Sequence, residues 1–380
     1  LMSKPLLITP RCFPNNFDLI RFVLASSVIL CHSFAIYLGY EKFLVTEPFM
    51  VWSQKQISIG SVAVDLFFII SGFLIVKSFE STANTVDYFK KRVLRIYPGF
   101  IVAFTLSILL VGFIGTGEQY NWEGYKQYFN SLFIKKELVH LFTLQSPYQR
   151  IFFKDSPEPG VNDSLWTIQF EFICYILVPV MAWFGYFKKK WVLITLFVIF
   201  YLLTWLQSLG YIFPFNNKIH LFFGNLYFLP RFITYFLGGA CFYFYRAVII
   251  RSNLLALLSC IALYGSFVWI KCIDQALPIA GSYLLFYLAF HNSIRFHNFA
   301  KHGDLSYGIY LYGWPIQALV MFYLKEYINP YSFFLIALPI AFIAAYCSWH
   351  LIEKPFLLFK NSKKSAASLS KSQINETVKA

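Results

Sequence analysis

The chain has 380 residues, of which 58% are hydrophobic, 21% aromatic and only 13% charged. A soluble protein with one core cannot bury that much apolar surface, so this composition predicts an all-α, polytopic membrane protein. The net charge of +14 would suit a nucleic-acid-binding protein, but the basic residues fall between apolar runs as in membrane proteins, which argues against nucleic acid as a partner.

About ten apolar runs approach the roughly 20 residues that a membrane-spanning helix needs. They cover residues 17–38, 59–78, 98–114, 164–186, 191–209, 226–246, 252–270, 276–291, 305–324 and 332–353. The first run has full spanning length and is therefore predicted to be a retained helix and not a cleavable signal. The run at 276–291 is the weakest, because it is short and carries Pro278 near its start.

Lys and Arg gather in alternate connections between these runs, while the connection at 115–163 is close to neutral. Because basic segments stay on the cytoplasmic side, both termini are predicted to be cytoplasmic. Residues 1–356 are predicted to form one transmembrane domain. Residues 357–380 are rich in Lys and Ser and are predicted to be a disordered cytoplasmic tail that lies against membrane lipids.

The first run contains Arg21 and His32, and the second contains Asp65. With a rise of about 1.5 Å per residue and an apolar core about 30 Å thick, Arg21 is expected about 6 Å above the cytoplasmic boundary and His32 about 22 Å above it. Asp65 reaches about 21 Å by the same rule. Titratable groups at such depth are costly and typically line a site or a pathway.

Just before the third run, Arg92 and Arg95 are one helical turn apart, a spacing at which two guanidinium groups can bind phosphates. The alternative is ordinary cytoplasmic charge. The outer segment 115–163 is dense in aromatic residues and has helical apolar spacing from Tyr125 to Phe142. It is either an interfacial helix with an aromatic belt or a surface that stacks on sugars.

The fourth run contains Glu171, at an expected depth of about 20 Å, and the sixth contains Arg231. Three titratable groups from three helices, His32, Asp65 and Glu171, thus share one level. A carboxylate can hold an imidazole in the tautomer that accepts a proton, so these three are candidate catalytic residues. A polar network that only joins helices is the alternative, and Arg231 is expected to form a structural ion pair with one of the carboxylates. The seven cysteines lack paired metal-ligand spacing, so no metal site is predicted.

Together, these motifs resemble the membrane-bound acyltransferase 3 family of bacterial O-acyltransferases, which modify surface polysaccharides and related glycans. The resemblance rests on six motifs in the family's order: Arg-x10-His (Arg21, His32), V-D-L-F-F-I-I-S-G-F (Val64 to Phe73), R-V-L-R-I-Y-P (Arg92 to Pro98), S-L-W-T-I-Q-F-E (Ser164 to Glu171), L-S-Y-G-I-Y-L-Y-G-W-P (Leu305 to Pro315) and I-E-K-P-F (Ile352 to Phe356).

This resemblance implies a ten-helix domain in the bacterial inner membrane, with no bound cofactor. It would take an acyl group, usually acetyl, from cytoplasmic acyl-CoA such as acetyl-CoA and pass it to a hydroxyl of a surface glycan. Lipopolysaccharide O-antigen, exopolysaccharide or a lipid-linked glycan are such acceptors. His32 is then the catalytic residue, accompanied by Glu171 and Asp65, while Arg21, Arg92 and Arg95 bind the acyl donor.

The chain departs from the family's pattern at two positions: Gly313 replaces a frequent His, and Lys354 replaces a frequent Arg. No catalytic role is therefore carried to Gly313. The hydrolase-like domain that some members carry is also absent from this sequence, so transfer is expected to need the membrane domain alone or a separate partner.

The mechanism that these residues favour has His32 as general base for the acceptor hydroxyl, oriented by Glu171 or Asp65. A separation of about 16 Å between Arg21 and His32 matches the reach of an extended pantetheine arm. An acyl-His intermediate is left open. A polar passage is predicted from Arg21 and Arg92 to His32, Asp65 and Glu171, walled by the first four spans and capped by the 115–163 segment.

A transporter or flippase for a glycan or a small acyl-bearing substrate is the alternative from another class, because buried Arg, His, Asp and Glu can also relay protons. The sequence lacks a detectable internal repeat and paired helices broken by Gly or Pro, which argues against it.

Overall fold

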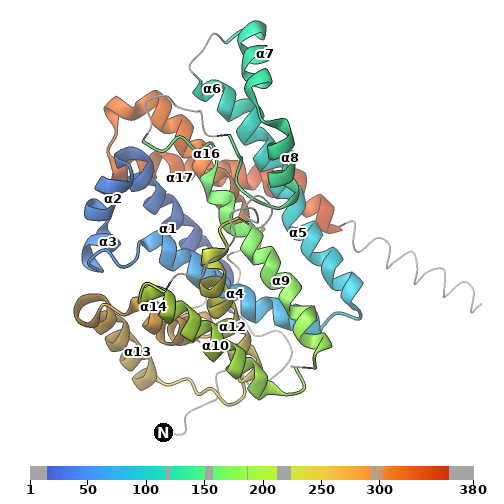
Figure 1. Ribbon diagram of the computed structural model, residues 1–380, viewed down its shortest axis with the longest axis vertical. Coiled ribbons are helices and arrows are strands. Elements are labelled where there is room, and N and C mark those ends of the chain that lie inside the picture. Colours follow the sequence, from blue (N-terminus) through green and yellow to red (C-terminus); the bar gives the residue numbers. More distant parts are fainter. Residues whose placement is uncertain are drawn as a thin grey trace, which may run out of the picture.

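The computed structural model describes residues 15–116, 120–149, 157–185, 187–211, 224–291 and 303–358, together with residues 296, 299 and 301. Within these residues, the regular structure is helical throughout (Figure 1). The first half contains α1 (Phe17–Leu38), α2 (Tyr40–Thr46), α3 (Pro48–Trp52), α4 (Ile59–Glu80), α5 (Thr85–Leu106), α6 (Phe113–Gly115), α7 (Trp122–Ser131), α8 (Ile134–Phe142) and α9 (Ile168–Trp183).

The second half contains α10 (Lys190–Ser208), α12 (Leu229–Phe244), α13 (Asn253–Gly265), α14 (Ile273–Ala276), α15 (Ser282–Ala289), α16 (Ser306–Leu324) and α17 (Pro330–Ser348). Short turns extend several of these helices. They are π-helical at Ser107–Gly112, Ser266–Ile270, Leu277–Gly281 and Trp349–Glu353, and 3₁₀ at Asp163–Thr167 (η2), Leu226–Phe228 and Lys325–Tyr327.

Within the described residues, most of each of the ten predicted runs is helical, which confirms the all-α polytopic fold. Seven helices, counting extensions, are long and apolar enough to cross a membrane: Phe17–Leu38, Ile59–Glu80, Thr85–Gly115, Asp163–Trp183, Lys190–Ser208, Asn253–Ile270 and Pro330–Leu358. The other three runs are helical but less apolar or shorter. Arg231 lies in α12, tyrosines and Gln317 lower the hydropathy of α16, and the helix that includes Pro278 ends at Ala289.

The third helix begins earlier than the apolar run 98–114 indicated. It starts at Thr85, because Asn84 caps it by accepting a hydrogen bond from the backbone N–H of Asp87. Arg92 and Arg95 therefore lie inside α5. The predicted helical stretch from Tyr125 to Phe142 forms two helices, α7 and α8.

Of the predicted basic tail, residues 359–380 lie outside the described part of the chain, and residues 357 and 358 extend the last helix. The predicted cytoplasmic position of both termini rests on the charge pattern alone.

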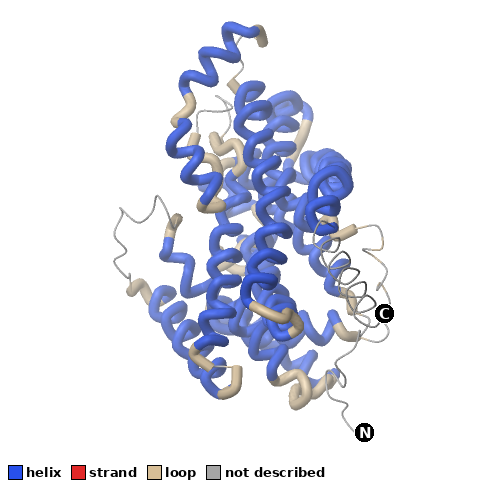
Figure 2. The backbone as a smooth tube through the Cα atoms, turned by 90° about the vertical axis from the view of Figure 1, so that its right-hand side faces the viewer, coloured by secondary structure: helices blue, strands red, loops and turns tan. Residues whose placement is uncertain are grey.

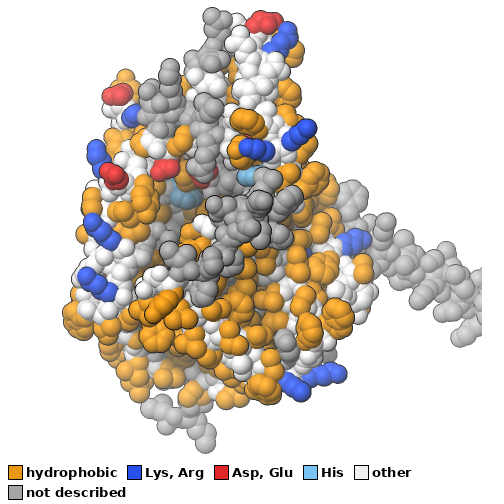
Figure 3. All heavy atoms as spheres, viewed as in Figure 1, with side chains coloured by type: hydrophobic (Ala, Val, Ile, Leu, Met, Phe, Trp, Pro, Cys, Tyr) orange, Lys and Arg blue, Asp and Glu red, His pale blue; other side chains and the backbone are white. Residues whose placement is uncertain are grey.

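Helix α4 lies at the centre of the bundle and packs against α1, α9 and α12. Figure 2 shows the long helices side by side, and Figure 1 shows α7 projecting beyond one end of them. Helix α8 lies against α5, where Tyr97 donates to the carbonyl of Phe142. Helices α10 and α13 expose most of their apolar side chains, and hydrophobic side chains cover much of the lower half of the face in Figure 3. Apolar surface on this scale suits contact with lipid.

Two glycines bring the backbones of α4 and α12 into direct contact. A Cβ atom on Gly72 would lie 1.9 Å from the carbonyl oxygen of Phe236, and one on Gly239 would lie 1.9 Å from that of Ile69. Small residues at a helix crossing in a membrane allow this close approach. The crossing holds α4 against α12, and α4 in turn supplies one wall of the cavity described below.

We expect Gly72→Ala to destabilise the protein by about 1–3 kcal/mol, the usual cost of overpacking. The atom that its methyl group would meet belongs to the backbone, which cannot rotate away. Gly265→Ala in α13 is the matched control, because its Cβ would meet only the side chain of Trp269, at 3.8 Å. Thermal unfolding in detergent measures both, and equal midpoints for the two variants would contradict the close-contact account.

Candidate active site

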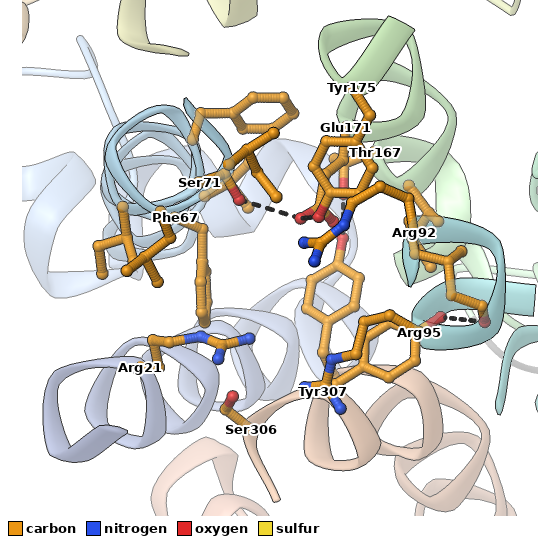
Figure 4. Close-up of a pocket in the computed structure, with 18 residues that line it drawn as sticks. Arg21, Phe67, Ser71, Arg92, Arg95, Thr167, Glu171, Tyr175, Ser306 and Tyr307 are labelled. Carbon is orange, nitrogen blue, oxygen red and sulfur yellow. Dashed lines mark hydrogen bonds between the residues drawn. The ribbon is translucent and has the colours of Figure 1, made fainter. Parts of the chain in front are cut away.

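A cavity of about 150 Å³ lies between α1, α4, α5, α9 and the start of α16 (Figure 4). Four of the six predicted site residues line it: Arg21, Arg92, Arg95 and Glu171. The other polar lining residues are Ser71, Thr167, Tyr175, Ser306, Tyr307 and Tyr310. Four of the five walls come from the first four predicted spans, as expected, and the α16 wall was not predicted.

Two carboxylates neutralise the charge of two of these arginines. Arg21 and Arg95 both pair with Asp304, Arg95 at 2.6 Å, and Arg95 also pairs with Glu353 at 3.1 Å. The Arg95 guanidinium lies over the rings of Tyr307 and Trp349, with centroid distances of 5.4 and 5.7 Å. This network joins α1, α5, the start of α16 and the turn after α17.

Asp304 is held as a carboxylate by its neighbours. Burial by itself raises its pKa, but the charges of Arg21 and Arg95 and hydrogen bonds from Ser306 outweigh burial and hold the pKa well below its ordinary value. Asp304 therefore remains negatively charged at neutral pH.

Arg92 has no carboxylate partner among the described residues. Its Nη2 atom donates to Ser78 Oγ at 3.3 Å, its Nε atom is buried without a hydrogen-bond partner, and its guanidinium lies 5.7 Å from the centre of the Tyr175 ring. A guanidinium that lines a cavity and forms no ion pair there can bind an anion.

Glu171 is held in place by two hydroxyl groups. Its Oε1 atom accepts hydrogen bonds from Ser71, at 3.0 Å, and from Tyr175, one turn further along α9. Figure 4 shows this group across the cavity from Arg21. The carboxylate is therefore fixed in orientation inside the cavity.

Asp65 lies elsewhere. It is fully buried and receives two hydrogen bonds from Arg231, at 3.0 Å from Nε and 2.6 Å from Nη2. It does not line the cavity. The expected ion pair of Arg231 with one of the carboxylates is thus present, and it ties α4 to α12.

His32 also lies outside the cavity lining. Its ring meets that of Trp314 edge to face, with centroids 4.7 Å apart, and its Nδ1 atom is buried with no hydrogen-bond partner in the described structure. Trp314 Nε1 donates to the carbonyl of Gly160 at 2.7 Å. The tryptophan therefore contacts both His32 and the segment that precedes η2 and α9.

The expected cluster of His32, Asp65 and Glu171 is therefore not formed in this structure, and the predicted passage reaches only Glu171. Rise along a helix fixes how deep a residue lies, but not which way its side chain points around the helix axis. Asp65 points toward α12, while Glu171 points into the cavity. A depth calculated from helix rise therefore does not predict which side chains meet.

Helix α16 nevertheless connects the cavity with the histidine. Tyr310 lines the cavity, and Trp314, one turn further on the same face of α16, contacts His32. Phe67 also lines the cavity and packs against the hydrophobic cluster that contains Trp314. Along α16, the position that lines the cavity and the position that contacts His32 are thus about one helical turn, roughly 6 Å, apart.

Sequence reasoning missed the carboxylates of Asp304 and Glu353. An ion pair of Asp304 could have been predicted, because a lone acidic residue in a strongly basic connection of a membrane protein needs a cationic partner. Nothing in the sequence predicted that the hydroxyls of Ser71 and Tyr175 bind Glu171.

Comparison with known proteins matches most of the chain to a protein family. Residues 15–352 match the sequence model of a family described as "Acyltransferase domain". An O-acetyl transferase of Shigella phage Sf6 is 28% identical over 352 residues, covering 92% of this chain and 98% of that protein. Nodulation protein 10 of Rhizobium leguminosarum bv. viciae is 25% identical over 371 residues, covering 92% and 94%. No solved structure matches the chain.

Proposed function

Because the chain belongs to the acyltransferase 3 family, we propose that it transfers an acetyl group from cytoplasmic acetyl-CoA to a hydroxyl of a surface glycan. The bacterial inner membrane is the proposed location, with lipopolysaccharide or exopolysaccharide as the acceptor class. The phage relative that carries the name O-acetyl transferase supports acetyl as the acyl group.

The observation that carries this proposal is the cavity lined by three arginines and Glu171. Figure 4 shows Arg92 beside Glu171, with Arg21 and Arg95 on the other side of the cavity. CoA bears several phosphates, and guanidinium groups bind phosphate with paired N–H donors. With Arg21 and Arg95 paired to carboxylates, Arg92 offers the attraction for the nucleotide end of the donor. The cavity of about 150 Å³ is smaller than the roughly 300–1,000 Å³ of most ligand pockets, so it suits the slender acyl-bearing arm.

We expect Arg92→Lys to weaken acetyl-CoA binding by about 1.5–3 kcal/mol, the range for hydrogen bonds to charged groups. Lys keeps the positive charge but lacks the planar fork. Lys91→Arg, one position earlier on α5, is the control, because Lys91 donates to Thr82 and does not line the cavity. Titration of the purified protein with acetyl-CoA measures both. An unchanged affinity of Arg92→Lys for acetyl-CoA would show that Arg92 is an ordinary membrane-flanking charge and does not bind the donor.

In the proposed reaction, the oxygen of the acceptor hydroxyl attacks the carbonyl carbon of the acetyl-CoA thioester, and His32 accepts the proton of that hydroxyl. The C–S bond breaks, and the imidazolium returns the proton to the departing thiolate. The unpartnered Nδ1 atom and the Trp314 contact support this role, since the ring is held while one nitrogen has no protein partner.

Glu171 is proposed to act inside the donor cavity, where its fixed carboxylate would position the acyl arm. Asp65 is proposed to act away from the reacting atoms, because both of its oxygens accept hydrogen bonds from Arg231. Its contribution would be to hold α4, which bears Phe67 and Ser71, against α12.

The experiment that tests this function compares the surface polysaccharide of cells with and without the gene. Proton NMR of the purified glycan should contain O-acetyl signals only when the gene is intact, and a His32→Ala allele should not restore them. An unchanged glycan, together with altered export of polysaccharide, would instead favour a transporter.

A further inference from the structure

A second, larger cavity of about 530 Å³ lies at the N-terminal end of α9. It is formed by α8, the segment 145–149, the first turns of η2 and α9, and residues 224 and 225. By the charge pattern, this end of the helices faces the outside. Its lining residues are Phe133, His140, Gln145, Ser146, Pro147, Tyr148, Gln149, Trp166, Gln169, Phe170, Gly224 and Asn225.

Aromatic rings and amide groups dominate this outer cleft. Phe133 and Trp166 expose 52% and 39% of their surface, so flat apolar faces are open to a ligand. Four amide side chains add both hydrogen-bond donors and acceptors: Gln145, Gln149, Gln169 and Asn225. Neither Asp, Glu, Lys nor Arg is among the described lining residues.

The cleft is a built structure and not a loose loop surface. Glu137 is buried and accepts hydrogen bonds from the backbone N–H groups of Tyr148 and Gln149, at 3.0 and 2.8 Å. Lys136 lies over the Tyr148 ring, 4.0 Å from its centre. These contacts hold the 145–149 segment against α8, so the Tyr148 ring and the backbone of Gln149 are positioned before a ligand binds.

This cleft and the arginine-lined cavity lie on different faces of one short stretch of η2 and α9. Trp166, Gln169 and Phe170 line the outer cleft, while Thr167, Ile168 and Glu171 line the inner cavity. Alternate faces of a single short stretch of η2 and α9 thus serve the two cavities. A ligand in the outer cleft would lie directly across this stretch from Glu171.

We infer that the outer cleft binds a neutral sugar unit of the acceptor, an inference that rests on the proposed function. A sugar ring presents an apolar C–H face and a rim of hydroxyls, and it matches aromatic faces beside amide groups. A phosphate-bearing ligand finds no Lys or Arg among the described lining residues. A lipid tail would place apolar carbon against the amide side chains that line the cleft, which is unfavourable for polar groups.

Direct binding by two cleft variants and one control tests the inference. The probe is oligosaccharide released by mild acid from the surface polysaccharide of cells that lack the gene, titrated calorimetrically into purified protein. Trp166→Leu removes the stacking face, and Gln149→Leu removes one amide at nearly constant volume. Trp122→Leu is the control, because Trp122 is an exposed aromatic residue of α7 outside the cleft.

We expect Gln149→Leu to weaken binding of the oligosaccharide about two- to tenfold, as the loss of one hydrogen bond does. Trp166→Leu should weaken it by about tenfold or more, and Trp122→Leu should leave it unchanged. Acetyl-CoA affinity should stay at the wild-type value in all three, which verifies that each variant is folded.

The outcomes separate this inference from the proposed function. If the wild-type protein does not bind the oligosaccharide, or if both cleft variants bind it as the wild type does, the outer cleft is not the sugar site. If the cleft variants lose binding but the wild-type protein transfers no acetyl group from acetyl-CoA to the oligosaccharide, the sugar site stands and the proposed function fails.

Discussion

His32→Ala should lower acetyl transfer by about 100- to 10,000-fold, the usual contribution of a general base. The expected loss follows from a ring that is held against Trp314 and has one nitrogen without a protein partner. Transfer of radiolabelled acetyl from acetyl-CoA to glycan by purified protein measures it.

The structure also sets what His32→Ala should leave intact. His32 does not line the cavity that contains the arginines, so acetyl-CoA affinity should be close to that of the wild-type protein. Expression in the membrane should be normal as well. Substantial residual transfer in a variant that binds acetyl-CoA normally would remove His32 from the chemistry.

Asp65→Asn should destabilise the protein by about 3–5 kcal/mol, because breaking a buried ion pair leaves an uncompensated charge. The Asp65 side chain is 1% exposed and that of Arg231 is 23% exposed, so water can stabilise a lone Arg231 only in part. The midpoint of thermal unfolding in detergent measures the change.

The double variant Asp65→Leu with Arg231→Met distinguishes a structural role from a catalytic one. Replacing both members of a buried pair by apolar residues is often neutral or stabilising, so this variant should regain thermal stability and most of its transfer activity. A double variant that is stable but inactive would show that Asp65 takes part in the reaction.

Helix positions were predictable from this sequence because they depend on local properties. Apolar runs of spanning length predicted α1, α4 and α17. The early start of α5 was missed, since hydropathy detects the part of a helix in the membrane and not its polar extension up to the Asn84 cap.

The candidate site was predictable only in part. The Arg21, Arg92 and Arg95 positions could be grouped, because charge and topology place them on one side of the membrane. Two of these arginines form ion pairs and Arg92 does not, because Asp304 and Glu353 lie beside Arg21 and Arg95. These two carboxylates come from distant parts of the chain, so the pairing could not be predicted from local sequence. The separation of Asp65 from His32 depends on the rotation of α4 about its axis, which directs Asp65 toward Arg231 of α12.

One measurement tests the central claim most directly: release of CoA by the purified wild-type protein, reconstituted in vesicles, with acetyl-CoA present and with or without oligosaccharide from gene-deleted cells. We predict release that depends on the oligosaccharide, equals the amount of acetyl group recovered on it, and falls to background in His32→Ala. Oligosaccharide-independent release, or release without acetylated product, would contradict transfer to a glycan.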